Sequence, residues 1–201
     1  MKKLFLIILS LTFILCFDAE VRAQSFKVGA GGGLTNVIGP DSYTKSISDG
    51  GLGFSSGYNL GIMAKLGLPL IPLTPRGFFL YNNLSKDESG VENSQSISSL
   101  GVGVQYGFIP IPAGFDPYLS LDVVYNNFGD LTTKTSTEEL KSSGGSRFGL
   151  QLGVGTEIAI VPVINLDVFA GYNWYNLTGK EDGEDTISAF VIDVFVVFNL
   201  L

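Results

Sequence analysis

Histidine is absent from this 201-residue chain, and cysteine occurs once, as Cys16. Without histidine, the Ser-His and Asp-His mechanisms are excluded, and without a second cysteine the chain can form no internal disulfide and no cysteine-based metal site. Basic residues are also few, 12 against 19 acidic ones. Nucleic-acid binding needs a basic surface, so no such partner is expected. We expect no catalytic residue, no cofactor and no metal.

Long apolar runs are missing as well. After Gln24 no stretch reaches the ~18 apolar residues of a membrane-spanning helix. The one apolar run before it, from Leu4, has about 14 residues, follows two lysines and leads to a small-residue motif ending at Ala23. This pattern predicts a secretory signal at residues 1–23 and a mature domain at 24–201. A lipoprotein signal ending at Cys16 is the alternative, but Leu15 stands where a small residue is normal.

What the chain has instead is alternation. In the last stretch, 186–201, apolar residues such as Phe190 and Ile192 occupy the even positions, while Asp193 and Asn199 lie at odd ones. A period of two predicts a β-strand with two unlike faces. Seven further segments suggest strands: 26–34, 56–68, 76–85, 96–108, 118–128, 146–161 and 163–177. The facing of 76–85 stays open, because its apolar residues are adjacent.

The connections between these segments are of two kinds. Those at 69–75, 110–117 and 162 are short and hold seven of the eight prolines, whereas those near 35–55, 86–95, 129–145 and 178–185 are longer and hold twelve of the 19 acidic residues. Segments of about 10 alternating residues, with short turns at one end and long loops at the other, are typical of outer-membrane barrels. We predict an all-β fold: an eight-stranded antiparallel up-and-down transmembrane β-barrel with both termini periplasmic. A soluble lipocalin-like barrel would bury its apolar face instead.

The inward face of this barrel combines glycines with charges. An eight-stranded barrel has an interior just wide enough for side chains to fill, and small residues leave room for long ones. The basic residues of this face are Lys27, Lys65 and Arg147, and its acidic residues are Asp122, Glu157, Asp167 and Asp193. Because buried charges must be paired, they predict a salt-bridged plug. The competing hypothesis is a conduction or proton path lined by the same groups.

Aromatic residues gather at two levels of the outward face. Four lie toward the loop ends of their strands and three toward the turn ends, as expected for the girdles of a membrane barrel. They are Tyr58, Tyr125, Tyr172 and Trp174, then Tyr106, Phe108 and Phe198. Ordinary β-propensity explains any one of them equally well, so the girdle prediction rests on the two levels.

Other motifs have simpler explanations. The loop 180–185, KEDGED, could hold a divalent cation, but it lacks the rest of a calcium loop, and a solvated acidic tip is the better interpretation. The glycines at 51, 53 and 57 resemble a phosphate-binding run, yet no helix follows them. Asp167 and Asp193 could approach each other on adjacent strands, and a structural ion network explains them as well as acid–base chemistry does.

Taken together, the signal, the eight alternating segments and the asymmetric connections resemble the small eight-stranded outer-membrane barrels of the OmpA- and OmpX-like superfamily. The resemblance covers Gln24 to Leu201 and implies a place in the bacterial outer membrane, with membrane lipid and the barrel-insertion machinery as partners. Such families usually end in an aromatic residue, whereas this chain ends in Leu201. No OmpA-type peptidoglycan-binding domain follows in this sequence.

The resemblance leaves three functional hypotheses. The first is a non-enzymatic envelope protein that stabilises the membrane and presents acidic loops to an unknown surface partner. The second is a narrow, porin-like conduit for small solutes or hydrophobic molecules. A lipid-modifying enzyme is the third, and it is disfavoured because the comparable enzymes use histidine.

Overall fold

The structure, a computed structural model, describes residues 25–68, 71–108 and 114–200, and most of them lie in β-strands. The predicted signal and Leu201 lie outside these ranges. Eight long strands form the body: β1 (Ser25–Gly39), β2 (Ser56–Gly67), β3 (Leu73–Glu88), β4 (Val91–Gly107), β5 (Phe115–Phe128), β8 (Ser146–Val161), β9 (Ile164–Thr178) and β10 (Ser188–Asn199). Between them lie two helical turns, α2 (Asp41–Thr44) and η1 (Ile47–Asp49), and a short hairpin, β6 (Leu131–Lys134) and β7 (Glu139–Ser142). In the described ranges, no helix has the length and apolar character to cross a membrane.

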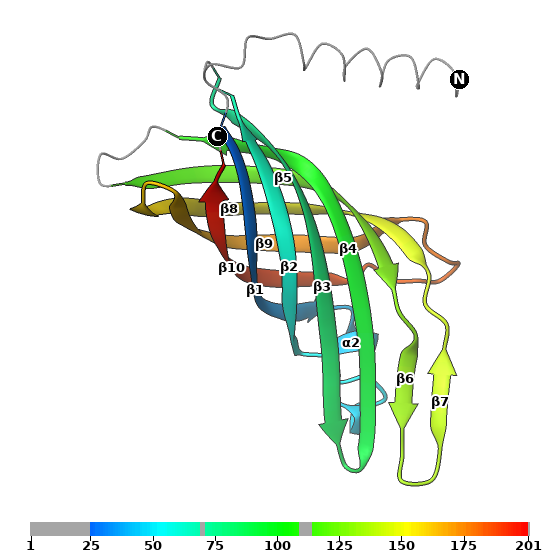
Figure 1. Cartoon of the computed structure of the whole chain (residues 1–201). Helices are drawn as coiled ribbons and strands as arrows, with labels where there is room; N and C mark the ends of the chain where they lie inside the picture. Colours follow the sequence, from blue (N-terminus) through cyan, green and yellow to red (C-terminus); the bar gives the residue numbers. More distant parts are fainter. Residues whose placement is uncertain (1–24, 69–70, 109–113, 201) are drawn as a thin grey trace.

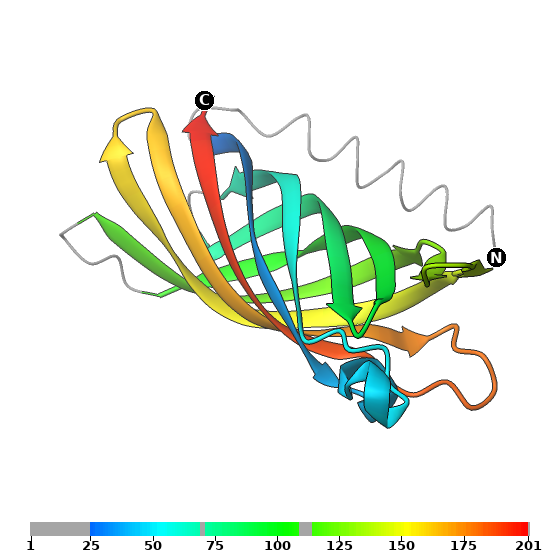
Figure 2. The ribbon, with the colours of Figure 1, turned by 90° about the horizontal axis from the view of Figure 1, so that it is seen from below.

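The eight long strands close into an antiparallel barrel. Their order is β3-β2-β1-β10-β9-β8-β5-β4, and β3 pairs with β4 to complete the ring. The first and last strands lie side by side in Figures 1 and 2, and they pair from Lys27 with Asn199 to Gly39 with Ser188. Closure leaves none of the eight strands with a free edge, which a hydrocarbon environment demands. The predicted fold class is confirmed.

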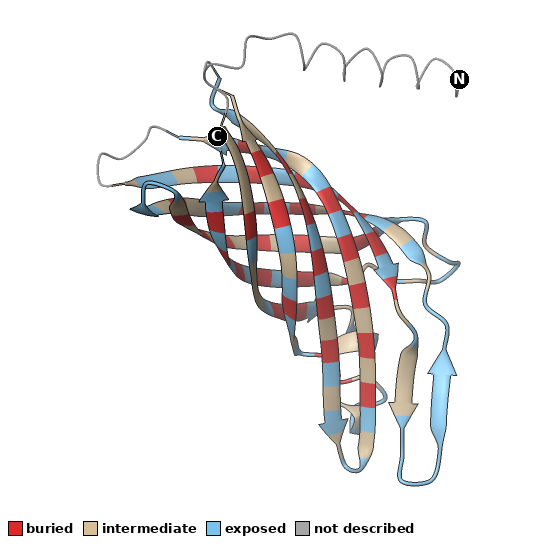
Figure 3. Cartoon of the chain, viewed as in Figure 1, coloured by how far each residue is buried: buried red, intermediate tan, exposed pale blue. Residues whose placement is uncertain are grey.

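Burial alternates along every barrel strand, visible as alternating bands in Figure 3. On β2, Ile62 is 61% exposed although its neighbour Met63 is buried, and on β4, Val102 is 62% exposed although Gly101 is buried. A water-soluble protein rarely exposes a continuous apolar belt of this kind, so the outward face fits lipid. The assigned parity is confirmed, and the open question on β3 is answered: Arg76, Phe78, Leu80, Asn82 and Leu84 point inward.

Three of the four predicted loops were drawn too long. The segment 86–95 is not a loop, because β3 and β4 continue as a paired hairpin to a turn at Ser89 and Gly90, where both residues have positive φ. Likewise, β1 extends to Gly39, and the segment 129–145 contains the β6–β7 hairpin. β6 pairs with β4 and with β7, so β3, β4, β6 and β7 form a four-stranded sheet beyond the loop end of the barrel, at the bottom of the view in Figure 1. The ends of β3 and β4 and the β6–β7 hairpin carry mostly polar residues on both faces, so they show no apolar–polar alternation that would have predicted strands.

The interior is layered rather than uniformly polar, which corrects the expected polar lumen. Along β3, from the turn end to the loop end, the inward residues run charged, apolar, amide and apolar again: Arg76, then Phe78 and Leu80, then Asn82, then Leu84. The first apolar layer joins β3 to β2, β5 and β10. Inward glycines make room for its rings: a Cβ at Gly101 would overlap the ring of Phe78.

A second apolar cluster lies at the loop end of the lumen. Its centre is Phe54, which has no exposed surface and comes from the segment between β1 and β2. The segment turns inward, and the Phe54 cluster includes residues of six barrel strands and of the β9–β10 loop, among them Val37, Leu84, Ile97 and Ile187. Tyr43 of α2 packs on Phe54, with ring centroids 5.9 Å apart. The β1–β2 loop is therefore folded into the mouth of the barrel.

Candidate functional site

Charged side chains cross the lumen near its turn end. Lys65 of β2 pairs with Asp167 of β9 and, at 3.3 Å, with Glu157 of β8, while Lys27 of β1 pairs with the other Glu157 oxygen. The Tyr118 hydroxyl donates to Asp167 at 2.5 Å. Two strands separate β2 from β9, and two separate β1 from β8, so these ion pairs reach across the ring. Four of the seven predicted lumen charges are thus brought together.

Asp122 belongs to a second pair, with a partner that the sequence analysis missed. Arg76 of β3 donates from Nε to Asp122 Oδ1 at 2.7 Å and from Nη2 to Oδ2 at 2.5 Å. This two-point geometry is the strong form of an Arg–carboxylate interaction. Arg76 also reaches Gln151 Oε1 at 3.3 Å on β8. Asp122 is fully buried and Arg76 nearly so, so the loss of either side chain would leave the other charge buried without a counter-ion.

Asp193 lies apart from these ion pairs. Its Oδ1 accepts a hydrogen bond from Asn59 Nδ2 at 2.7 Å, and no salt bridge among the described residues includes it. Asp193 faces Phe169 in the β9–β10 register, whereas Asp167 faces Phe195. Asp167 and Asp193 are therefore offset by two residues on adjacent strands and do not bond to each other: Asp167 bonds to Lys65 and Tyr118, and Asp193 to Asn59.

An amide-rich layer lies on the loop side of these charged residues. Asn59 links to Thr35, Thr35 to Asn82, Asn82 to Ser99 and Ser99 to Asn126, over distances of 2.6 to 3.4 Å. Behind it, a cavity bordered by β3, β4, β5, β8 and β9 has a volume of about 10 Å³, enough for about one water molecule. Charged, apolar and amide layers thus follow one another along the lumen.

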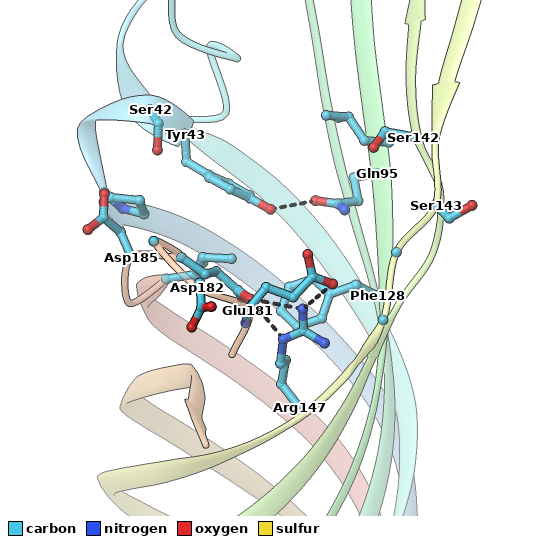
Figure 4. Close-up of a pocket in the computed structure, with 17 residues that line it drawn as sticks. Ser42, Tyr43, Gln95, Phe128, Ser142, Ser143, Arg147, Glu181, Asp182 and Asp185 are labelled. Atoms are coloured by element: carbon cyan, nitrogen blue, oxygen red, sulfur yellow. Dashed lines mark hydrogen bonds and ion pairs between the residues drawn. The ribbon is translucent and has the colours of Figure 1, made fainter. Parts of the chain in front are cut away.

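Arg147 was predicted to join the lumen network, and this prediction is wrong. Its side chain is at the mouth of the barrel, where Nη2 lies 2.8 Å from Glu184 and 3.3 Å from Glu181 (Figure 4). Its parity was right, but Arg147 is the second residue of β8 and therefore sits at the loop end. Alternation tells which face a residue occupies and not its height along the strand.

Glu184 anchors the last loop through several contacts. Partial burial raises the pKa of Glu184. Hydrogen bonds from Arg147, from the backbone N–H of Glu181 and from Asn176 together lower it by more than burial raises it, so the pKa lies below its ordinary value. Asn176 in turn accepts from the Ile187 N–H at 2.6 Å. The carboxylate thus holds the β9–β10 loop in its folded position.

Above this anchor lies a cavity of about 520 Å³, which we call the mouth cavity. It is lined by α2, by the segment after β7 and by the β9–β10 loop, and its apolar residues are Tyr43, Phe128, Leu131 and Ile187. In Figure 4, Asp182 and Asp185 lie on the side opposite Ser142 and Ser143. Its size is in the range of small-molecule sites. In the described part of the chain, no three acidic residues gather closely enough to hold a metal ion.

The predicted girdle residues all point outward. At the loop side, the rings of Tyr172 and Trp174 are 4.7 Å apart, and Tyr125 packs edge-on against Phe148 at 5.2 Å. At the turn side, Tyr106 and Phe108 pair at 5.8 Å. Tyr58 and Phe198 are also exposed. That these rings anchor the barrel at the two membrane interfaces stays a prediction.

The sequence did not point to two buried residues of the barrel interior, Arg76 and Phe54, for different reasons. Arg76 was not predicted because the sequence did not show which face of its strand points inward. The excess of inward acidic residues over inward basic ones could have indicated a further basic residue. Phe54 was not predicted because the residues that it packs against lie far away in the sequence, and apolar–polar alternation does not predict a loop that folds inward.

Solved structures share this architecture. Neisserial surface protein A is 19% identical, with a TM-score of 0.61 over 89% of this chain and 100% of that one. A major outer membrane protein from Thermus thermophilus is 16% identical, with a TM-score of 0.60 over 89% of this chain and 100% of that one. OprG from Pseudomonas aeruginosa is 14% identical, with a TM-score of 0.50 over 89% and 96%. Such low identities show the fold alone, and no curated protein matches the sequence.

The family assignment comes from the sequence. The family model of the outer membrane protein beta-barrel domain matches residues 9–198, which include all the barrel strands except the final Asn199 of β10. The outward apolar belt, the closed ring and this match agree on a bacterial outer-membrane location. The chain belongs to the outer membrane protein beta-barrel domain family.

Proposed function

We propose that this protein is a non-enzymatic envelope barrel whose lumen is plugged and whose acidic loops make surface contacts. The observation that carries the plug is the set of ion pairs reaching across the ring, Lys65 to Asp167 and Lys27 to Glu157, with Arg76 and Asp122 beside them. A solute would have to break buried charge pairs, which costs about 3–5 kcal/mol for each partner left alone.

Two further features support a plug over a conduit. The Phe54 cluster blocks the loop end with packed apolar side chains. In addition, each barrel strand pairs with both of its neighbours, so the described wall offers no lateral gap for a hydrophobic molecule. The lumen thus serves as a rigid core that holds the loops in place.

The loops are the part available for contact. Most of the chain's acidic residues lie at this end, in α2, in the hairpins and in the β9–β10 loop. We propose that this end is extracellular and that both termini are periplasmic, since outer-membrane barrels keep their longer connections outside. Removal of residues 1–23 during export is part of the same proposal.

Conductance of the purified barrel in planar lipid bilayers tests the plug. We expect no steady openings from the wild type. Steady, ion-selective openings whose size or selectivity changes in Asp193→Ala would contradict the plug and favour the conduit. Leu140→Ala is the matched control, because Leu140 is exposed on β7, away from the lumen.

A further inference from the structure

The mouth cavity has a composition that fits one class of ligand. We propose that it binds the primary ammonium group of an alkylamine, as carried by a free polyamine or by a lysine side chain. This inference rests on the proposed surface-contact role and names the chemistry of the contact. It is carried by the cavity itself, its apolar floor and the uneven charge of its walls.

The floor and one wall of the mouth cavity are apolar. Phe128 and Ile187 are buried members of the Phe54 cluster, and Leu131 packs beside them. Tyr43 forms the wall above, held by its packing on Phe54 and by a 3.1 Å hydrogen bond from its hydroxyl to Gln95 (Figure 4). Methylene groups of an alkyl chain can lie on such a surface while the charged end stays near water.

The opposite wall is strongly acidic. Among the described residues that line the cavity, four carry a negative charge and only Arg147 carries a positive one. Arg147 is already bonded to Glu181 and Glu184. Asp182 and Asp185 are exposed and take part in none of the salt bridges found in the described ranges. Within those ranges, two carboxylates are therefore left without a cationic partner beside an apolar pocket.

These walls favour an organic cation over a metal ion. The carboxylates of the described residues do not form a chelating group. An ammonium group instead offers three donors on a flexible stem, so it can reach separate carboxylates and hydroxyls. An aromatic ring within ~6 Å adds cation–π attraction. The apolar floor then selects a cation with a hydrocarbon stem.

Amide shifts in NMR spectra of the isotope-labelled barrel in lipid nanodiscs test this proposal. The probes are cadaverine, for a free amine, and the peptide acetyl-Gly-Lys-Gly-amide, for a lysine side chain. Acetyl-Gly-Gln-Gly-amide is the uncharged control. We expect saturable shifts at residues 142–145 and 181–187 with at least one amine and none with the glutamine peptide. Tighter binding of cadaverine assigns a polyamine, and tighter binding of the peptide assigns a protein partner.

Matched variants separate a site from general attraction. Asp182→Asn with Asp185→Asn should weaken amine binding about fivefold to tenfold, since each exposed ion pair contributes modestly. Asp87→Asn with Glu92→Gln removes the same charge at the β3–β4 hairpin and should change affinity less than about twofold. Tyr43→Phe should retain binding, and Tyr43→Leu should weaken it.

Three results would overturn the proposal: no saturable shift with either amine, equal shifts with the glutamine peptide, or equal weakening in the two charge variants. The conductance test examines the lumen and this test examines the mouth cavity. Either proposal can therefore fail while the other stands.

Discussion

At the scale of single residues, Arg76 and Asp122 show that a buried charge in the lumen needs an oppositely charged hydrogen-bond partner. Both side chains are buried inside the ring of strands, and the two hydrogen bonds between them are short. Such a pair contributes little net stability compared with apolar side chains of equal volume. Removing one partner, however, leaves the other charge buried without a counter-ion. The pair is therefore a constraint on the interior more than a source of free energy.

Replacing Asp122 should change the free energy of unfolding of the barrel, measured by urea titration in lipid vesicles. Asp122→Asn should lower it by about 3–5 kcal/mol, because Arg76 is left buried without its counter-ion. Adding Arg76→Met should restore most of the loss. Asp116→Asn, at an exposed position of the same strand, is the control and should stay within about 0.5 kcal/mol of the wild type. A double variant no more stable than the single one would contradict the pairing argument.

The strands and loops show where sequence reasoning succeeds. Alternation assigned the faces of seven strands, because lipid outside and a crowded lumen inside impose opposite demands on neighbouring residues. It failed on β3 for a physical reason: Phe78 and Leu80 belong to an apolar layer of the lumen, so both faces of that strand are apolar there. It also failed where the β3–β4 hairpin leaves the membrane, because both faces are then polar.

The loop ends follow a different rule, since long-range contacts decide them. Glu184 receives hydrogen bonds from Arg147 and Asn176, and no local pattern in the loop predicts these partners. The segment 180–185 is a solvated acidic tip only in part: Asp182 and Asp185 are exposed, whereas Glu184 is held by Arg147 and Asn176.

Loop anchoring by Glu184 should depend on pH. Because its pKa in the folded protein lies below the ordinary value of about 4.3, its bonds stabilise the loop fully above that pH and are lost as the pH falls through the lower folded value. We expect the amide signals of residues 179–187 to move or broaden as the pH is lowered below about 4. In Glu184→Gln this transition should be absent. A transition of equal size in that variant would assign it to another group.

The barrel viewed in full is a closed cylinder of eight strands, and the proposed plug would make its lumen a support for the loops. Its fold class, strand count and outward belt could be predicted from the sequence, since they follow from period and composition. The layered interior and the inward fold of Phe54 could not, because they depend on which strands meet across the ring. The mouth cavity is likewise a product of segments far apart in sequence, from Tyr43 to Asp185.

The central claim is a sealed lumen inside a lipid-facing wall, and thiol accessibility in intact cells tests it most directly. In a Cys16→Ser background, single cysteines replace Ser99 in the lumen, Leu100 on the lipid face and Ser142 at the loop end. We predict that a charged, membrane-impermeant thiol reagent labels Ser142→Cys alone, while a lipid-soluble maleimide labels Leu100→Cys but leaves Ser99→Cys unmodified. Labelling of Ser99→Cys by the charged reagent as fast as Ser142→Cys would show an open path through the barrel and contradict the account.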